Sequence, residues 1–247
     1  MSANIDQLLE RRQTWRAGTP GSPDRARSRL ELSRFIAEHY VGFDPLRNHL
    51  FHPDHGHVLD KRARQQAAPV IERLRDIGWI TPAGGDDWRP TDLDDSHAYL
   101  AGGWLEELTF CAHEAAGVDE ACYGQDVEWL VDGIAGRNEI DIIARRGDVL
   151  SFTSCKTIQP QKSPGKNTTL RGFLSETDYW NIHFANDRGR ALLVVTADFL
   201  DEMRRNRHRY PELLARASVL EVSLVGLEEL RWDRLIERIH GHWRRNE

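Results

Sequence analysis

The chain has 247 residues, of which 40% are hydrophobic and 29% are charged, and its formal net charge is -6 at pH 7. This balance is typical of a folded globular protein and excludes a disordered chain, while the length allows one large domain or two small ones. No apolar run approaches the roughly 20 residues of a membrane-spanning helix, and the N-terminus lacks the apolar core of a signal peptide. Three cysteines without paired spacing indicate a reducing, cytoplasmic setting.

The first elements are expected to be helical. We expect a short helix over residues 3–16, which ends at a cluster of Gly, Pro and Ser over residues 18–23. Asp24 is a candidate N-cap for a second helix, whose apolar residues between Leu30 and Tyr40 recur with a rough helical period.

A loop, a helix and a hairpin are expected next. Residues 43–57 are rich in His and Pro and favour a loop, and residues 60–76 favour a third helix. Residues 79–81 and 88–90 flank a Gly/Asp turn and predict a small hairpin. Helices followed by a short hairpin indicate a winged-helix-like module, so we expect a mostly helical domain over residues 1–95.

The second half has a clearer pattern of alternating elements. Its expected elements are a helix over 102–115, strands over 121–131, 138–144 and 149–155, a helix over 170–185, a strand over 191–196, a helix, a strand over 218–222 and a final helix over 227–240. Glycine-containing turns between the first three strands predict hairpins, and the continuous apolar run at 191–196 predicts a buried strand. The order predicts an α/β (α+β) domain over residues 96–247, with a mixed sheet flanked by helices.

Two of the expected strands carry a group of residues suited to phosphate chemistry. Because side chains alternate along a strand, Glu139 and Asp141 share one face of the second strand, as Ser154 and Lys156 share one face of the third. A carboxylate binds Mg²⁺ or Mn²⁺, and a lysine orients water or stabilises charge on phosphate oxygens. Glu106, early in the preceding helix, is a candidate second carboxylate. An acid on a helix, an acid on a strand and a lysine on the next strand form a minimal set for phosphodiester hydrolysis.

Three short segments in this order carry a family resemblance. Gly102-Gly103-Trp104-Leu105-Glu106, Asn138-Glu139-Ile140-Asp141 and Cys155-Lys156-Thr157 resemble motifs of the PD-(D/E)xK nuclease superfamily. The chain is more closely similar to the nuclease domain of the Card1/Can2 group of CRISPR-associated type III effectors, over roughly residues 98–240. The resemblance implies a restriction-endonuclease-like fold and a metal-dependent endonuclease that cuts DNA or RNA in CRISPR or other antiviral defence. It also implies a homodimer, and a sensor carried by a separate protein.

The resemblance also assigns roles to single residues. It implies that Glu106, Asp141 and Lys156 are catalytic, with Glu139 and Ser154 in support. It implies that Mg²⁺ or Mn²⁺ is held by Glu106, Asp141 and the backbone carbonyl of Cys155.

Two departures from the family pattern matter. The family has a glutamate where this chain has Ser154, and a serine brings no charge to a divalent ion. The missing carboxylate is lost or is supplied from elsewhere, with the candidates Glu106, Glu107, Glu128 and Glu139. The alternative function is therefore a catalytically impaired nuclease-fold protein that binds nucleic acid or acts as a scaffold. The second departure is length: about 95 residues are too few for the sensor domain that the family carries, which indicates a fragment or a stand-alone relative. The resemblance therefore does not imply that this chain binds the second messenger.

Other polar clusters have simpler explanations. His49, His52, His55 and His57 invite a metal-site interpretation, but a plain surface loop explains them better. The runs 204–209 and 242–245 are rich in Arg and His; they would contact phosphates or form the solvated face of a helix. The net negative charge argues against passive coating of nucleic acid, and a third hypothesis makes the N-terminal module a regulatory binding domain.

Overall fold

The computed structural model describes residues 3–51, 59–84, 87–91, 95–131, 133–160, 168–185, 189–201 and 207–244. The chain forms two compact units, one of Met1–Leu30 with Glu106–Glu247 and the other of Glu31–Leu105. This division differs from the expected boundary at residue 95, because the first 30 residues belong with the C-terminal part.

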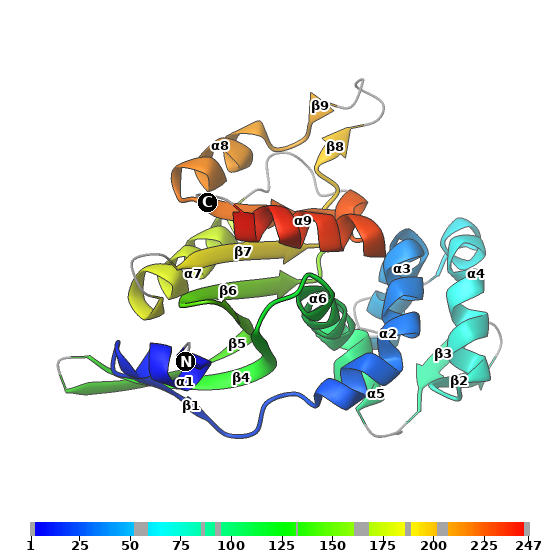
Figure 1. Cartoon of the computed structure of the whole chain (residues 1–247). Helices are drawn as coiled ribbons and strands as arrows, with labels where there is room; N and C mark the ends of the chain where they lie inside the picture. Colours follow the sequence, from blue (N-terminus) through cyan, green and yellow to red (C-terminus); the bar gives the residue numbers. More distant parts are fainter. Residues whose placement is uncertain are drawn as a thin grey trace. The chain divides into compact units, whose positions relative to one another are not determined.

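The larger unit is built on a six-stranded sheet with the order β1-β4-β5-β6-β7-β10 (Figure 1). Its strands are β1 (Thr14–Ala17), β4 (Glu120–Val131), β5 (Ile134–Arg146), β6 (Val149–Lys156), β7 (Arg190–Val195) and β10 (Val222–Val225). The first four pair antiparallel, whereas β6, β7 and β10 pair in parallel. The expected mixed sheet flanked by helices is confirmed, and the three central strands lie within a few residues of their predicted positions.

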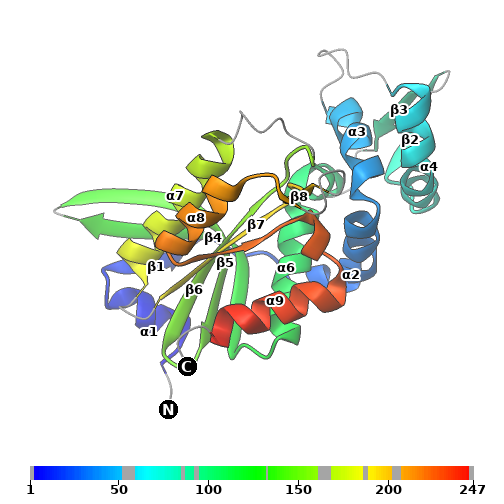
Figure 2. The same cartoon turned by 90° about the horizontal axis from the view of Figure 1, so that it is seen from above.

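Helices cover both faces of this sheet (Figure 2). On one face, α1 (Ile5–Glu10) and α7 (Thr168–Phe184) pack against Phe152 of β6, and α7 and α8 (Pro211–Val219) pack against Leu193 of β7. On the other face lie α6 (Trp104–Ala115) and α9 (Trp232–Arg244), whose His113 and His242 bond to Thr153 and Ser151 of β6. Alternation along β6 therefore sends even-numbered residues towards α7 and odd-numbered residues towards α6 and α9.

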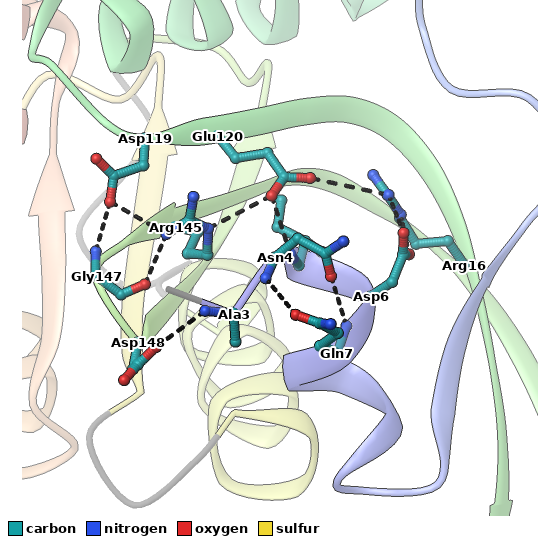
Figure 3. Close-up of polar contacts among 11 residues, drawn as sticks. Ala3, Asn4, Asp6, Gln7, Arg16, Asp119, Glu120, Arg145, Gly147 and Asp148 are labelled. Atoms are coloured by element: carbon teal, nitrogen blue, oxygen red, sulfur yellow. Dashed lines mark hydrogen bonds and ion pairs between the residues drawn. The ribbon is translucent and has the colours of Figure 1, made fainter. Parts of the chain in front are cut away.

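The N-terminal segment is part of the sheet unit. The expectation of one helix over residues 3–16 is wrong, because the helix ends at Glu10 and β1 follows, paired with β4. Figure 3 shows how the helix start is fixed: Glu120 of β4 accepts the Ile5 backbone N–H at 3.0 Å and bonds to Arg145 of β5 at 3.4 Å. The strand pairing and these polar contacts explain why the first residues belong to the larger unit.

The smaller unit is helical with one hairpin. It contains the second half of α2 (Pro23–Glu38), then α3 (Tyr40–Phe51), α4 (Lys61–Asp76), β2 (Ile80–Gly84), β3 (Asp87–Pro90), α5 (Ser96–Ala98) and a π-helical turn at Tyr99–Gly103. The expected third helix is confirmed as α4, whose N-cap Asp60 accepts the Ala63 backbone N–H at 2.7 Å. The N-cap expected at Asp24 is wrong, because α2 already begins at Pro23. The antiparallel hairpin is also confirmed. The loop expected over residues 43–57 is wrong for 43–51, which are helical, and residues 52–58 lie outside the described part.

The C-terminal region differs from expectation in detail. Residues 218–222 were expected as a strand, but α8 runs to Val219 and the strand β10 begins only at Val222, after Glu221 with a φ of 56°. A short hairpin of β8 (Leu200–Asp201) and β9 (Arg207–His208) was not predicted, and a 3-10 turn, η5 (Leu227–Glu229), precedes α9. In the part of the chain that the structure describes, no helix is long and apolar enough to cross a membrane.

Candidate active site

Asp141 lies on β5 where that strand stops pairing with β6. The register of the two strands reaches Ile142 opposite Thr153 and goes no further. At the adjacent residue, Asp141, the side chain and not the backbone bonds to β6. Its Oδ2 accepts the backbone N–H of Cys155 at 2.6 Å and the hydroxyl of Ser154 at 3.3 Å. These bonds fix the carboxylate against the C-terminal end of β6.

Lys156 is the last residue of β6 and reaches the same carboxylate. Its Nζ lies 3.4 Å from Asp141 Oδ2 and 5.8 Å from the ring centroid of Phe173 on α7. Burial disfavours the ammonium, but the negative charges of Asp141 and Glu176 outweigh it and raise the pKa of Lys156. The expected placement of Asp141 and Lys156 on neighbouring strands and the same side of the sheet is confirmed, and the lysine carries its charge at neutral pH.

Glu106 approaches this pair from the first turn of α6. Burial, followed by the negative charges of Asp141 and Glu139, raises the pKa of Glu106 to about 8. The structure therefore brings Glu106 close enough to Asp141 and Glu139 for their charges to act on it. Without a cation nearby, the Glu106 carboxyl is largely protonated at pH 7.

Glu139 and Ser154 complete the group. The Glu139 residue is exposed as a whole, but its carboxyl group is partly desolvated. This desolvation and the charge of Asp141 raise the pKa of Glu139. Ser154 is buried and hydrogen-bonded to Asp141. A cavity of about 10 Å³, space for about one water molecule, is lined by Glu139, Asp141, Ser154 and Lys156 together with Glu176 and Thr177 of α7. Cys155 contributes its backbone N–H to Asp141, and a role for its carbonyl stays a prediction.

Two candidate substitutes for the missing carboxylate are engaged elsewhere. Glu107 is buried with its Oε1 3.3 Å from Arg29 and 3.7 Å from Arg25, both on α2. Glu128 accepts the indole N–H of Trp15 at 3.1 Å and pairs with Arg137 at 3.4 Å on the β4–β5 hairpin. Glu107 is paired with arginines, and Glu128 is paired with an arginine and bonded to an indole. Neither glutamate is therefore placed to supply the carboxylate that the family has at position 154.

The donor set suits a hard divalent ion, although the side chains stand apart. Among the described residues, no three His, Cys, Asp or Glu side chains are close enough together to hold a metal ion. All three bonds to Asp141 go to Oδ2, and Glu106 and Glu139 add carboxylate oxygens, the ligands that Mg²⁺ and Mn²⁺ prefer. Burial and, after it, the charge of Asp141 raise the pKa of both glutamates, and a cation would offset both effects. The chemistry of Asp141, Glu106 and Glu139 therefore fits such an ion.

The other polar clusters do not join this site. His49 lies in α3, 3.8 Å from Asp87, and His52, His55 and His57 lie outside the described residues. Residues 204–206 also lie outside, while Arg207 and His208 form β9, so the helix-face interpretation is wrong for these two. In the tail, His242 is buried and bonded to Ser151 and Ser223, each at 2.8 Å, which excludes it from a phosphate-contacting surface.

Sequence reasoning missed the contribution of α7. Phe173 and Glu176, three residues apart on that helix, both lie beside Lys156. It also missed Thr196, whose Oγ1 accepts the Ile158 N–H at 2.6 Å and whose backbone N–H donates to the Lys156 carbonyl at 3.2 Å. No motif marks these residues, because their roles depend on how α7 and the segment after β7 pack against β6.

The fold and this group of residues define a class: a helix-flanked mixed sheet that carries carboxylates and a lysine where two of its strands diverge. The solved structures that are similar to this chain include the following two. Protein VC1899 from Vibrio cholerae matches with a TM-score of 0.71 at 17% sequence identity, covering 98% of this chain and 62% of that chain. Can2 from Sulfobacillus thermosulfidooxidans, solved in complex with cyclic tetra-adenylate, matches with a TM-score of 0.57 at 14% identity, covering 96% of this chain and 60% of that chain.

At these identities the likeness shows a shared fold. It extends beyond residues 98–240, to which the sequence resemblance is confined, and it takes in nearly the whole chain. The chain spans about three fifths of the length of each neighbour. A scan against protein-family models gives no match, and a comparison with curated proteins gives none either.

Proposed function

We propose that this chain is a divalent-metal-dependent nuclease that hydrolyses phosphodiester bonds in DNA or RNA. The observation that carries the proposal is the convergence on Asp141, which accepts bonds from Ser154, the Cys155 backbone and Lys156, with Glu106 of α6 close enough for the charges of the two carboxylates to interact. A partly buried acid–lysine pair with a second carboxylate is the arrangement that phosphodiester hydrolysis needs. The shared fold with Can2 supports this assignment and a role in CRISPR or other antiviral defence.

The chain's own residues have distinct tasks in this proposal. Asp141 and Glu106 would hold the ion, which would polarise the phosphate and lower the pKa of a water molecule. Ser154 and the Cys155 backbone N–H keep Asp141 from rotating away. Lys156 presents a positive charge to the phosphate oxygens, on which negative charge gathers in the transition state. Because Lys156 is partly buried, its charge is screened less than that of a surface lysine.

Cleavage assays test the proposal. Plasmid DNA, single-stranded DNA and single-stranded RNA are incubated with the protein and Mn²⁺ or Mg²⁺. We expect wild-type cleavage of at least one substrate, and a loss of about 100- to 1000-fold in Lys156→Ala. Lys61→Ala, which removes an exposed lysine at the start of α4, is the matched control and should cleave at the wild-type rate. Equal cleavage by Lys156→Ala and wild type would overturn the proposal.

One observation favours a second candidate function, a nucleic-acid-binding or scaffolding protein with impaired catalysis. Ser154 brings no charge to the site, and the described acidic side chains stand too far apart to hold an ion as they lie. That function predicts nucleic-acid binding in a gel-shift assay with no cleavage under any divalent ion, and equal binding by wild type and Lys156→Ala.

We further propose that the larger unit forms a homodimer. The β4–β5 hairpin extends beyond the rest of the sheet (Figure 1) and exposes 74% of Ile134 and 40% of Leu130. Exposed apolar side chains of this size are typical of interaction surfaces, and symmetric dimers are the commonest oligomers. A dimer mass by light scattering, reduced to a monomer by Ile134→Asp, is expected; a monomer at high concentration would contradict it.

A further inference from the structure

Helix α7 forms a wall of the candidate site beside Lys156. Phe173 and Glu176 are three residues apart, so they lie on the same side of the helix. The Phe173 ring centroid is 5.8 Å from Lys156 Nζ, and the negative charge of Glu176 acts on the same ammonium. Lys156 is thus flanked by a carboxylate from β5, Asp141 at 3.4 Å, and by a second carboxylate from α7.

The short side chain of Ser154 leaves space beside Lys156 into which a carboxylate from α7 can reach. Ser154 and Lys156 share the strand face that is turned towards α7, and the short serine side chain ends at its bond to Asp141. A cavity of about 10 Å³ lies there, with Ser154 and Lys156 on the β6 side and Glu176 and Thr177 on the α7 side. A longer acidic side chain at position 154 would occupy this space and stand beside Lys156 itself.

We propose that Glu176 is a positioning residue of the active site, which with Asp141 aims Lys156 from α7 and so does the work that a carboxylate at position 154 would do from β6. The proposal rests on the proposed nuclease function. Glu176 acts through the lysine: two carboxylates on different elements define where the ammonium lies, whereas Asp141 alone leaves a flexible side chain one fixed point.

Asp178 lies on the same helix as Glu176 but interacts with a different charge. It lies two residues beyond Glu176, and the charge that acts on it is Arg216 of α8. Asp178 therefore faces away from Lys156, although it carries the same charge. Asp178→Asn removes one negative charge from α7 without touching the site, which makes it the matched control for Glu176→Gln.

The test combines steady-state cleavage with a metal-binding measurement that does not depend on activity. In Glu176→Gln we expect kcat to fall about 10- to 100-fold, with KM for the nucleic acid within about twofold of wild type. Titration calorimetry with Mn²⁺ alone should give the wild-type Kd, because Glu176 acts on the lysine and not on the ion. Adding Ser154→Glu to Glu176→Gln should recover about tenfold or more in kcat.

Each outcome decides the matter. A wild-type kcat in Glu176→Gln, an equal loss in Asp178→Asn, or no recovery in the folded double variant would overturn the positioning role. A loss of Mn²⁺ affinity that matches the loss of kcat would also overturn it, because Glu176 would then bind the ion. Melting temperatures confirm folding, and Ser154→Asp replaces Ser154→Glu if the larger side chain prevents it. Failure of the nuclease function itself is separate, since only that failure leaves Lys156→Ala as active as wild type.

Discussion

Glu106→Gln should remove a pH dependence of stability that the wild-type chain has above pH 6.5. Burial and the charges of Asp141 and Glu139 raise the pKa of Glu106 from 4.5 in the unfolded chain to about 8 in the folded one. Between these values the folded state holds a proton that the unfolded state has released, so stability falls as pH rises. Glutamine has the shape of the protonated acid and cannot ionise, so the variant loses this slope.

The magnitude follows from the width of the pH window. Each pH unit costs about 1.4 kcal/mol while only the folded state holds the proton, so the interval from pH 6.5 to 8 costs about 2 kcal/mol. His113, buried and with its pKa lowered from 6.5 to about 3, contributes little in this interval and contributes equally to wild type and Glu106→Gln. The difference between the two proteins therefore isolates Glu106 from the other strongly shifted group.

The assay is urea unfolding at several pH values between 6.5 and 8, without divalent ions. Wild type should lose about 2 kcal/mol of unfolding free energy relative to Glu106→Gln. Glu10→Gln, at an exposed glutamate of α1, should follow wild type. Added Mn²⁺ should cancel the slope in wild type only. Parallel pH profiles of wild type and Glu106→Gln would refute the placement of Glu106 beside Asp141.

Three further predictions concern single positions. Ser154→Glu should bind Mn²⁺ more tightly than wild type in calorimetry and keep or raise cleavage; tighter binding with slower cleavage would instead make Lys156 a proton acceptor. Gly42→Ala should lower unfolding free energy by about 1–3 kcal/mol, because the new Cβ would collide with the Gln66 carbonyl on α4, whereas Gly241→Ala, with open space around it, should not. Relative to His113→Gln, wild type should lose about 1.4 kcal/mol of unfolding free energy per pH unit as pH falls from 6.5 to 3, because the unfolded chain binds a proton at His113 that the buried, neutral imidazole of the folded state does not; parallel pH profiles of wild type and His113→Gln would contradict this cause.

The central strands of the sheet and the central pair of the site were predictable because they depend on local patterns. Alternation along β5 and β6 and the short turn between them set which side chains share a face, and this placed Asp141 beside Lys156. The glycine-containing turns set the hairpin register. The order of residues along the two strands was therefore enough to predict that Asp141 lies beside Lys156.

The predictions that failed concern features that depend on packing between segments distant in the sequence. The His- and Pro-rich stretch after Tyr40 favours a loop by composition, but Tyr40, Phe43, Leu46 and Leu50 recur at helical spacing and are buried. Burial of these side chains outweighs the cost of Pro45 in the helix. β1 is four residues long, and its partner β4 is more than 100 residues away. The role of α7 depends on which of its faces meets β6, which a single sequence does not reveal.

The most direct test of the central claim is cleavage of a labelled single strand in Mn²⁺ by wild type and Asp141→Asn, purified in parallel. Asparagine retains an oxygen that accepts the Cys155 backbone N–H, so the fold is kept while the charge that holds the ion is lost. We predict cleavage by wild type that a chelator abolishes, and none above background by Asp141→Asn. Equal cleavage by the two proteins would contradict the account, because the activity would not arise at this site.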